Sequence, residues 1–265
     1  MRLCSIASGS SGNCIYTGSD TTHLLVDAGI SAKRIGEGLK KLQLDGRDIQ
    51  GLLITHEHSD HIKGVGVLAR RYGFPIYATK GTIDRMKRTK SLGAVDSGLY
   101  HVIRADQRFM VGDVEVEPFT ISHDAAEPVA YRFRCGKKSA AVATDMGVYT
   151  DYIVERLKGV DALLLEANHD IQMLEVGPYP YELKRRILGS RGHLSNESAG
   201  QLLCRILHDG LKRVYLGHLS QENNYAELAY ETVRLEIRLD PVAYQPDDFD
   251  IQVAGRDACS EICEF

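Results

Sequence analysis

Short hydrophobic segments alternate with polar turns along the whole chain, and most of them have the length of a β-strand. Near the N-terminus, residues 3–6, 14–17 and 23–27 are separated by turns rich in glycine, serine and threonine, a spacing typical of antiparallel strands. Further strands are predicted at residues 49–54, 76–78, 107–113 (with a turn), 114–121, 129–134, 139–144, 162–165 and 213–216.

Other segments place apolar residues three or four positions apart, as one face of an α-helix does. Helices are predicted over residues 31–42, with Ser31 as the N-cap, and over 62–72, 81–90, 149–157, 194–208 and 226–239. No repeat of fixed period and no clear linker interrupts this alternation. We therefore expect one α/β (α+β) domain over residues 1–265, with two β-rich halves flanked by helices.

Composition and charge add limits on location and partners. Of the 265 residues, 43% are hydrophobic, which is ample for a large core. The formal net charge of -4 favours no polyanion, so nucleic-acid binding would depend on local basic clusters. No segment has the roughly 20 apolar residues of a membrane span or the apolar stretch of a signal peptide, so we expect a cytoplasmic protein. Six cysteines are scattered, and Cys259 and Cys263 could share a helix face as a disulfide or metal-binding pair.

Residues 52–61 place four metal-binding side chains directly after a buried strand: LLITHEHSDH. Because residues two apart in an extended segment point to the same side, His56 and His58 can converge on one ion. Asp60 and His61 follow where the chain turns towards a helix, so they can reach a second point nearby. Imidazole and carboxylate together suit zinc, manganese or iron. The segment therefore predicts a metal site.

The same arrangement, a buried strand that ends in a histidine or a carboxylate, recurs along the chain. It is found at Asp27, His123, Asp145, Glu166 and His218. Taken alone, each of these is also compatible with an ordinary turn residue. Because α/β proteins place their chemistry at the edge where strands end, we expect these side chains to lie together.

In this order, Asp27, residues 55–61, His123, Asp145 and His218 resemble the metallo-β-lactamase fold superfamily over almost the whole chain. The resemblance implies an αββα sandwich of two mixed β-sheets flanked by helices, with two divalent metal ions at one edge. It assigns His56, His58 and His123 to one ion and Asp60, His61 and His218 to the other, with Asp145 bridging them and Asp27 supporting the ligands. A bridging water would lose a proton near neutral pH and become the nucleophile, a bridging hydroxide.

Two further segments resemble motifs of tRNase Z, in which a histidine held by a glutamate lies beside the scissile phosphate. These are residues 166–169 (EANH) and 192–195 (GHLS). By this resemblance, Glu166 would orient His193, which would protonate the leaving oxygen, and Asp60 would complete the catalytic set. His169 would support the ligands or contact the substrate, and a purely structural role is equally compatible.

Several segments together are similar to one subfamily, the YycJ-like (WalJ) metallohydrolases: residues 8–13, 166–170, 178–187, 192–196 and 216–224. This resemblance implies a 5′ to 3′ exonuclease that acts on DNA. The chain has no room for the inserted domain of β-CASP nucleases, which disfavours an RNA-processing role of that kind. Two alternatives remain: a small-substrate metallohydrolase acting on a cyclic phosphodiester or a thioester, and a non-catalytic metal-stabilised binding protein.

Basic and small polar residues near these motifs are candidates for holding substrate phosphates. A basic run precedes His193 closely, and the loop at residues 8–13 offers consecutive backbone N–H groups suited to an anion. We expect phosphate contacts from Ser10, Ser11, Asn13, Lys184, Arg185, Arg186, Ser195 and Asn196.

Overall fold

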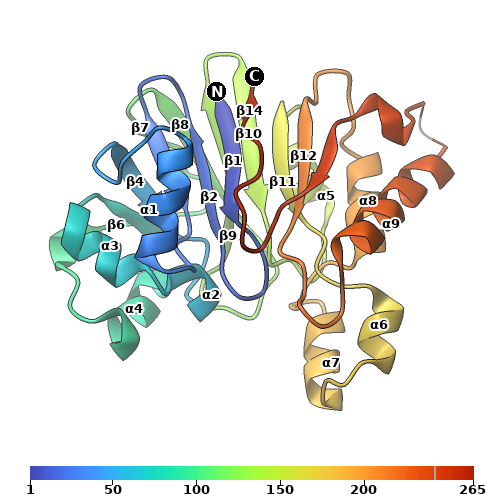
Figure 1. Ribbon diagram of the computed structural model, residues 1–265, viewed down its shortest axis with the longest axis horizontal. Coiled ribbons are helices and arrows are strands. Elements are labelled where there is room, and N and C mark those ends of the chain that lie inside the picture. The colour runs from blue at the N-terminus through green and yellow to red at the C-terminus, as the bar shows by residue number, and fades with distance from the viewer. Residues whose placement is uncertain (242) are drawn as a thin grey trace.

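Two seven-stranded β-sheets pack face to face in the computed structural model, which describes residues 1–241 and 243–265 (Figure 1). The strand orders are β14-β1-β2-β3-β4-β5-β6 in the first sheet and β13-β12-β11-β10-β9-β8-β7 in the second. Helices cover the outer faces of both sheets. The predicted αββα sandwich of two mixed sheets is therefore confirmed.

The first sheet is built mainly from the N-terminal part of the chain. Its strands are β1 (Arg2–Ala7), β2 (Cys14–Gly18), β3 (His23–Val26), β4 (Ile49–Leu53), β5 (Ile76–Thr79), β6 (Tyr100–Ile103) and β14 (Cys263–Glu264). Strands β14, β1, β2 and β3 pair antiparallel, and β3, β4, β5 and β6 pair parallel. Helices α1 (Ala32–Lys41), α3 (Val65–Tyr72) and α4 (Lys80–Arg88) cover its outer face.

The second sheet follows the same plan with later segments. Its strands are β7 (Phe109–Val111), β8 (Val114–Thr120), β9 (Val129–Cys135), β10 (Lys138–Ala143), β11 (Ala162–Glu166), β12 (Arg213–Gly217) and β13 (Ile251–Val253). Strands β7 to β10 pair antiparallel, and β10 to β13 pair parallel. Helices α5 (Asp151–Leu157), α8 (Asn196–Cys204) and α9 (Ala226–Leu239) cover it. Among the described residues, none of the helices is long and apolar enough to cross a membrane.

Strands buried on both faces explain the continuous apolar runs of the sequence. In β11, Leu164 points into the layer between the sheets, whereas Leu163 and Leu165 point towards the helices, and all three are fully buried. Successive side chains of a strand face opposite sides, so a strand covered on both sides has no polar face. This packing directs the ends of β3, β4, β10, β11 and β12 to one edge, the lower edge in Figure 1.

The prediction of one helix over residues 62–72 is wrong at its start. Helix α2 (Ser59–Ile62) ends before α3 begins, and Gly64 lies between them. The Gly64 N–H donates to the Ala28 carbonyl at 2.7 Å, and a Cβ at this position would come within 2.4 Å of the Ile30 carbonyl oxygen. The chain therefore breaks where it passes against the loop after β3. The helix predicted at 194–208 is also shorter, because Ser195 caps α8 through the Ser198 N–H.

The strands β6, β13 and β14 and the helices α6 (Ile171–Val176) and α7 (Tyr181–Leu188) were not predicted. Helix α6 buries only Leu174 and α7 only Ile187, so both helices make little contact with the core. The last two strands contain three and two residues and form only by pairing with β12 and β1. The described residues 254–265 contain no helix, and the Cys259 and Cys263 thiols are free, so the predicted shared helix face is wrong.

Replacing Leu164 by alanine is expected to destabilise the fold strongly, because it leaves a cavity between the two sheets. The free energy of unfolding should fall by about 2–5 kcal/mol in urea titrations. The matched control is Leu235→Ala on α9, where the side chain is 47% exposed and the loss should stay within about 0.5 kcal/mol. Equal losses in the two variants would contradict the packing described here.

Candidate active site

Seven side chains that the sequence marked as metal ligands converge at the lower edge of the sandwich. They follow β4 (His56, His58), occupy α2 (Asp60, His61), or follow β8 (His123), β10 (Asp145) and β12 (His218). They form overlapping groups, in each of which the candidate ligand atoms all lie within 4.8 Å of one another: His56, His58 and His123; His56, His61 and Asp145; and Asp60, His61 and His218. Residues as far apart in sequence as His56 and His218 thus share one site.

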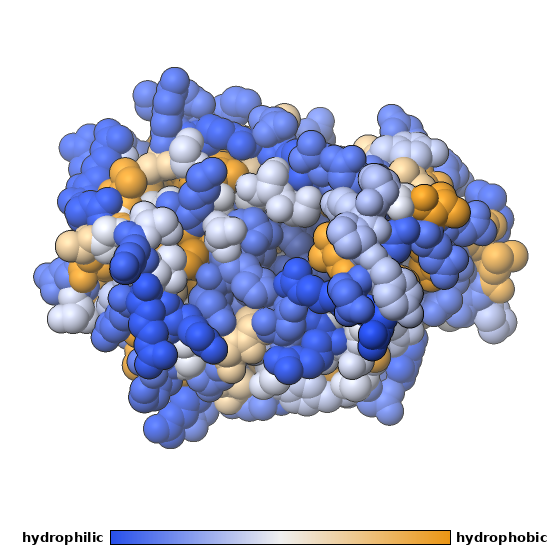
Figure 2. Space-filling view, turned by 90° about the horizontal axis from the view of Figure 1, so that it is seen from below, coloured by the Kyte–Doolittle hydropathy of each residue, from blue (hydrophilic) through white to orange (hydrophobic). Residues whose placement is uncertain are grey.

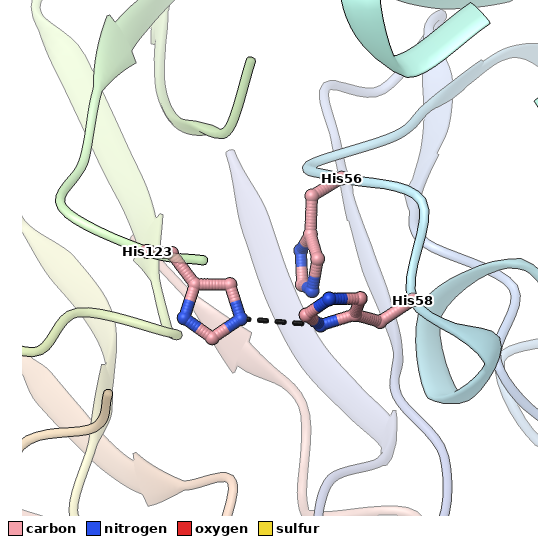
Figure 3. A group of neighbouring side chains, drawn as sticks. All are labelled: His56, His58 and His123. Atoms are coloured by element: carbon pink, nitrogen blue, oxygen red, sulfur yellow. Dashed lines mark hydrogen bonds between the residues drawn. The ribbon is translucent and has the colours of Figure 1, made fainter. Parts of the chain in front are cut away.

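The first group consists of three imidazole rings that point towards one another from two loops (Figure 3). The His58 Nδ1 and His123 Nε2 atoms are 3.2 Å apart. The His56 Nε2 atom is buried and has no hydrogen-bond partner among the described residues. Burial and the neighbouring charge of His61 hold the pKa of His56 well below its usual value, so this ring is neutral. An unpartnered, neutral, buried nitrogen among other donors fits a metal ion.

The Asp145 carboxylate lies between the group of His56, His58 and His123 and the group of Asp60, His61 and His218. Its Oδ2 is 3.4 Å from His61 Nε2, and its Oδ1 is 3.5 Å from His218 Nε2 and 3.8 Å from His123 Nε2. Burial opposes ionisation, but the charges of His218 and His61 hold the pKa of Asp145 well below its usual value. Asp145 Oδ2 is buried and makes no hydrogen bond to the described residues. This position fits the bridging role predicted for Asp145, and the whole donor set fits divalent metal ions.

Three strand ends turn sharply to aim these side chains into the site. Asp27, Asp145 and His218 all have left-handed backbone conformations, with φ of 60°, 63° and 56°. Such conformations are unfavourable for residues other than glycine and persist only where the surroundings impose them. At Asp27, Oδ1 accepts from the Thr55 N–H and Oδ2 from the Thr55 hydroxyl, each at 2.8 Å. Asp27 Oδ2 also lies 2.8 Å from His61 Nδ1, so this carboxylate orients the His61 ring.

Glu166, at the end of β11, holds two histidines at once. Its Oε1 accepts from His193 Nδ1 at 2.7 Å and from His218 Nδ1 at 2.9 Å. Its Oε2 accepts from the backbone N–H groups of Met146 (2.8 Å) and Leu194 (3.1 Å). Burial opposes the charge, but His193 and these hydrogen bonds lower the pKa of Glu166 to about 2. Glu166 therefore binds the Nδ1 atom of both rings, so the Nε2 atom of each ring is left for a contact with the metal site or the substrate.

A cavity of about 200 Å³ opens over these donors. It is lined by Ser10, His58, Asp60, Asp145, Asn168, Tyr179, Leu183, Arg186, Ile187, His193, His218 and Ser220. Figure 2 shows the lower face, on which hydrophilic side chains predominate and apolar ones are scattered. Helices α6 and α7 project beside it, and α7 contributes Leu183, Arg186 and Ile187 to the wall. Arg186 and the motif at residues 178–187 were identified from the sequence, whereas the helix that places them at this wall was not predicted.

The three residues of the predicted basic run on α7 have different positions relative to the cavity. Lys184 donates to the Glu175 carbonyl at 2.8 Å, and Arg185 pairs with Glu182 at 3.9 Å, both outside the cavity lining. Arg186 lines the cavity and makes two hydrogen bonds to Asp124, at 2.5 and 3.1 Å. Of these three cations, Arg186 is thus the one placed at the site.

Three expected phosphate contacts have other partners in the structure. Asn13 is fully buried, accepts from the Gly9 N–H and lies 3.2 Å from His61 Nε2. Asn196 is fully buried and exchanges hydrogen bonds with Asn224. Ser195 is 5% exposed and caps α8. These three side chains are thus buried and hydrogen-bonded within the protein. Ser10 and Ser11, in contrast, are exposed beside the cavity.

His169 supports the loop that carries His193. It is buried, its backbone forms a bridge with Ser195, and its carbonyl accepts from the Asn196 N–H at 2.9 Å. Burial lowers the pKa of His169 to about 4, so the ring is neutral. Its position favours the supporting role over substrate contact.

Arg256 lies near this cavity and was not selected from the sequence. Its guanidinium lies against the loop of Ser10 and Ser11, although it belongs to the C-terminal segment for which no element was predicted. A single arginine in an irregular segment carries no periodic or motif signal. Asn168, by contrast, lines the cavity from within the EANH motif, which could have indicated it.

Comparisons with known proteins agree with this geometry. The sequence profile of the family described as "Beta-lactamase superfamily domain" matches residues 22–219. The chain is 46% identical to exodeoxyribonuclease WalJ of Streptococcus pneumoniae serotype 2 (strain D39 / NCTC 7466), covering 86% of this chain and 85% of that protein. It is 43% identical to exodeoxyribonuclease YycJ of Bacillus anthracis, covering 86% of each.

The fold is also similar to solved structures of distant sequence. Zn²⁺-bound PqqB from Methylobacterium extorquens aligns with a TM-score of 0.71 over 100% of both chains, at 16% identity. The match of the family profile, the identity to two relatives over most of their length and the shared sandwich lead to one conclusion. The chain belongs to the metallo-β-lactamase superfamily and, within it, to the YycJ-like (WalJ) metallohydrolases.

Proposed function

We propose that this protein is a metal-dependent exodeoxyribonuclease that removes nucleotides from the 5′ end of DNA. The observation that carries the proposal is the Glu166–His193 pair beside seven clustered metal-binding side chains. A hydrolase needs a nucleophile and an acid on opposite sides of the scissile bond, and this site offers residues for both. The relatives named exodeoxyribonuclease, at 43% and 46% identity, support DNA as the substrate.

We assign two divalent ions, of zinc, manganese or iron, to the donor set. One would be held by His56, His58 and His123 and the other by Asp60, His61 and His218, with Asp145 between them. When bound, the ions lower the pKa of coordinated water and offset charge on a phosphate. The unpartnered atoms His56 Nε2 and Asp145 Oδ2 support this assignment.

His193 acts as the proton donor to the leaving oxygen. Its Nδ1 is held by Glu166 at 2.7 Å, and its side chain is 15% exposed and lines the cavity. Glu166 is a positioning residue: it is fully buried and fixes both His193 and His218. Arg186 on the cavity wall would hold a phosphate oxygen, exchanging Asp124 for the substrate. We further propose that residues 1–265 act as one domain, since residues of both sheets, among them Leu24 and Leu164, share one buried core.

Replacing Asp145 by alanine is expected to remove bound metal and to abolish cleavage of a 5′-labelled oligonucleotide. The buried donors would lose their shared carboxylate, so the repulsion between two cations would no longer be offset. Metal content is measured by elemental analysis of purified protein, and cleavage by gel electrophoresis. The matched control is Asp84→Ala, an exposed carboxylate on α4. Cleavage that survives loss of metal would show that the proposed chemistry is wrong.

Replacing His193 by alanine should leave metal content unchanged while turnover falls by about 10²–10⁴-fold, the usual contribution of a general acid. The matched control is His208→Ala, since His208 bonds to the Val160 carbonyl away from the cavity. Loss of metal from the His193 variant would make this residue a ligand instead of an acid.

The wild-type enzyme should also cleave the oligonucleotide in preference to cyclic or aryl phosphodiesters. The small esters lack the additional phosphates that basic residues around the site can hold, so they gain less binding energy. Rates on the substrates are compared at equal enzyme and metal concentrations. Turnover of the small esters without any cleavage of DNA would refute the nuclease proposal.

A further inference from the structure

A second cavity adjoins the one over the metal-binding side chains. It has a volume of about 280 Å³ and shares Ser220 with the first. Its walls come from the β1–β2 loop, the β12–α9 loop and the C-terminal segment, and include Ser8, Gln221, Asn224, Tyr225 and Arg256. Tyr225 is 53% exposed at this position. The edge of the sandwich therefore offers space beyond the reaction centre that the proposed chemistry does not use.

Arg256 lies between the two cavities and contacts the loop of residues 8–13, which we call the serine loop. Its Nη1 donates to the hydroxyl oxygens of Ser11 at 3.1 Å and Ser10 at 3.4 Å, and its Nη2 donates to the Leu219 carbonyl at 2.8 Å. Ser10 lines the first cavity and Arg256 the second. A Cβ at Gly9 would lie 2.9 Å from Nη1, so glycine at that position allows the guanidinium to lie against the loop.

The charge of Arg256 is not neutralised by a carboxylate within the part of the chain that the structure describes. Its hydrogen-bond acceptors there are two hydroxyl groups and one carbonyl, and the neighbouring Asp257 pairs instead with Arg34 at 3.0 Å. Arg186 differs, because Asp124 binds it through two hydrogen bonds. A guanidinium with free charge beside two exposed hydroxyls is suited to a phosphate group.

The surrounding backbone holds this arginine in place. The Ala254 N–H donates to the Leu216 carbonyl at 2.8 Å, and the Gly255 carbonyl accepts from the Ser8 N–H at 3.0 Å. Arg34 donates to the Arg256 carbonyl at 2.9 Å. The C-terminal segment is thereby tied to β12, to the serine loop and to α1. Because the guanidinium is held before a ligand arrives, little conformational entropy is lost on binding.

We propose that Arg256, with the hydroxyls of Ser10 and Ser11, binds the 5′-terminal phosphate of the DNA strand. This inference rests on the proposed nuclease function and specifies how the enzyme recognises the strand end. The subsite lies beside the cavity in which the scissile phosphate would sit, so the terminal nucleotide would bridge the two. A terminal phosphate carries more negative charge than an internal one, and an unneutralised arginine distinguishes the two on that basis.

The test measures binding of oligonucleotides that differ only at the 5′ end, a phosphate or a hydroxyl. Phosphorothioate linkages block cleavage, and fluorescence anisotropy gives Kd for the metal-loaded protein. Wild-type protein should bind the phosphorylated strand at least about 10-fold more tightly, as expected for a charge-assisted hydrogen bond. In Arg256→Ala this preference should vanish while affinity for the hydroxyl strand changes little. Ser11→Ala, a change at an exposed position, should reduce the preference by a smaller factor.

The control for lost positive charge is Arg238→Ala, an exposed residue on α9, which should keep the full preference. The proposal is overturned if wild-type protein binds both strands equally, or if Arg256→Ala weakens both strands by the same factor. Cleavage of an unmodified oligonucleotide by wild-type enzyme is measured in parallel. Absence of that cleavage refutes the nuclease function, whereas cleavage without a 5′-phosphate preference refutes the subsite alone.

Discussion

The crowding of ionisable side chains at one edge of the sandwich is the constraint on which the rest of this structure depends. Five histidines and two carboxylates lie close together there, and His56, His61 and Asp145 are almost completely buried. Buried donors without partners cost free energy unless something compensates them. Bound metal ions would supply that compensation, so the stability of the loops around the site would depend on the ions that they hold.

Carboxylates behind the ligands keep this arrangement in order. Asp27 fixes His61 from one sheet, and Glu166 fixes His193 and His218 from the other. Each carboxylate is also held by backbone N–H groups, so the orientation of the rings is transmitted from the strands themselves. The left-handed turns at Asp27, Asp145 and His218 are tolerated because the ends of well-packed strands impose them.

The parts of the molecule around the candidate active site differ in how they are built. The ligands follow rigid strands, whereas the cavity wall includes α7, which projects from the body with one buried residue. Arg256 comes from a segment with little regular structure that is tied down by hydrogen bonds to three other elements. A rigid centre with more variable surroundings is how one fold serves different substrates, because chemistry and recognition change independently.

The sequence by itself determined most strands and the residues gathered at one edge, and the family resemblance of its motifs implied the sandwich. Those features are encoded locally: buried strands are apolar runs, and the histidine-rich segment follows one of them directly. The sequence could not show that Asn13, Ser195 and Asn196 are buried, since a polar side chain looks the same in a wall as on a surface. It also did not predict α6, α7 or the position of Arg256, because short elements with one buried residue and single residues of an irregular segment are fixed by their tertiary contacts. Tertiary packing alone decided these positions. It brings the C-terminal segment against a loop far away in sequence, since Arg256 contacts Ser10, 246 positions before it.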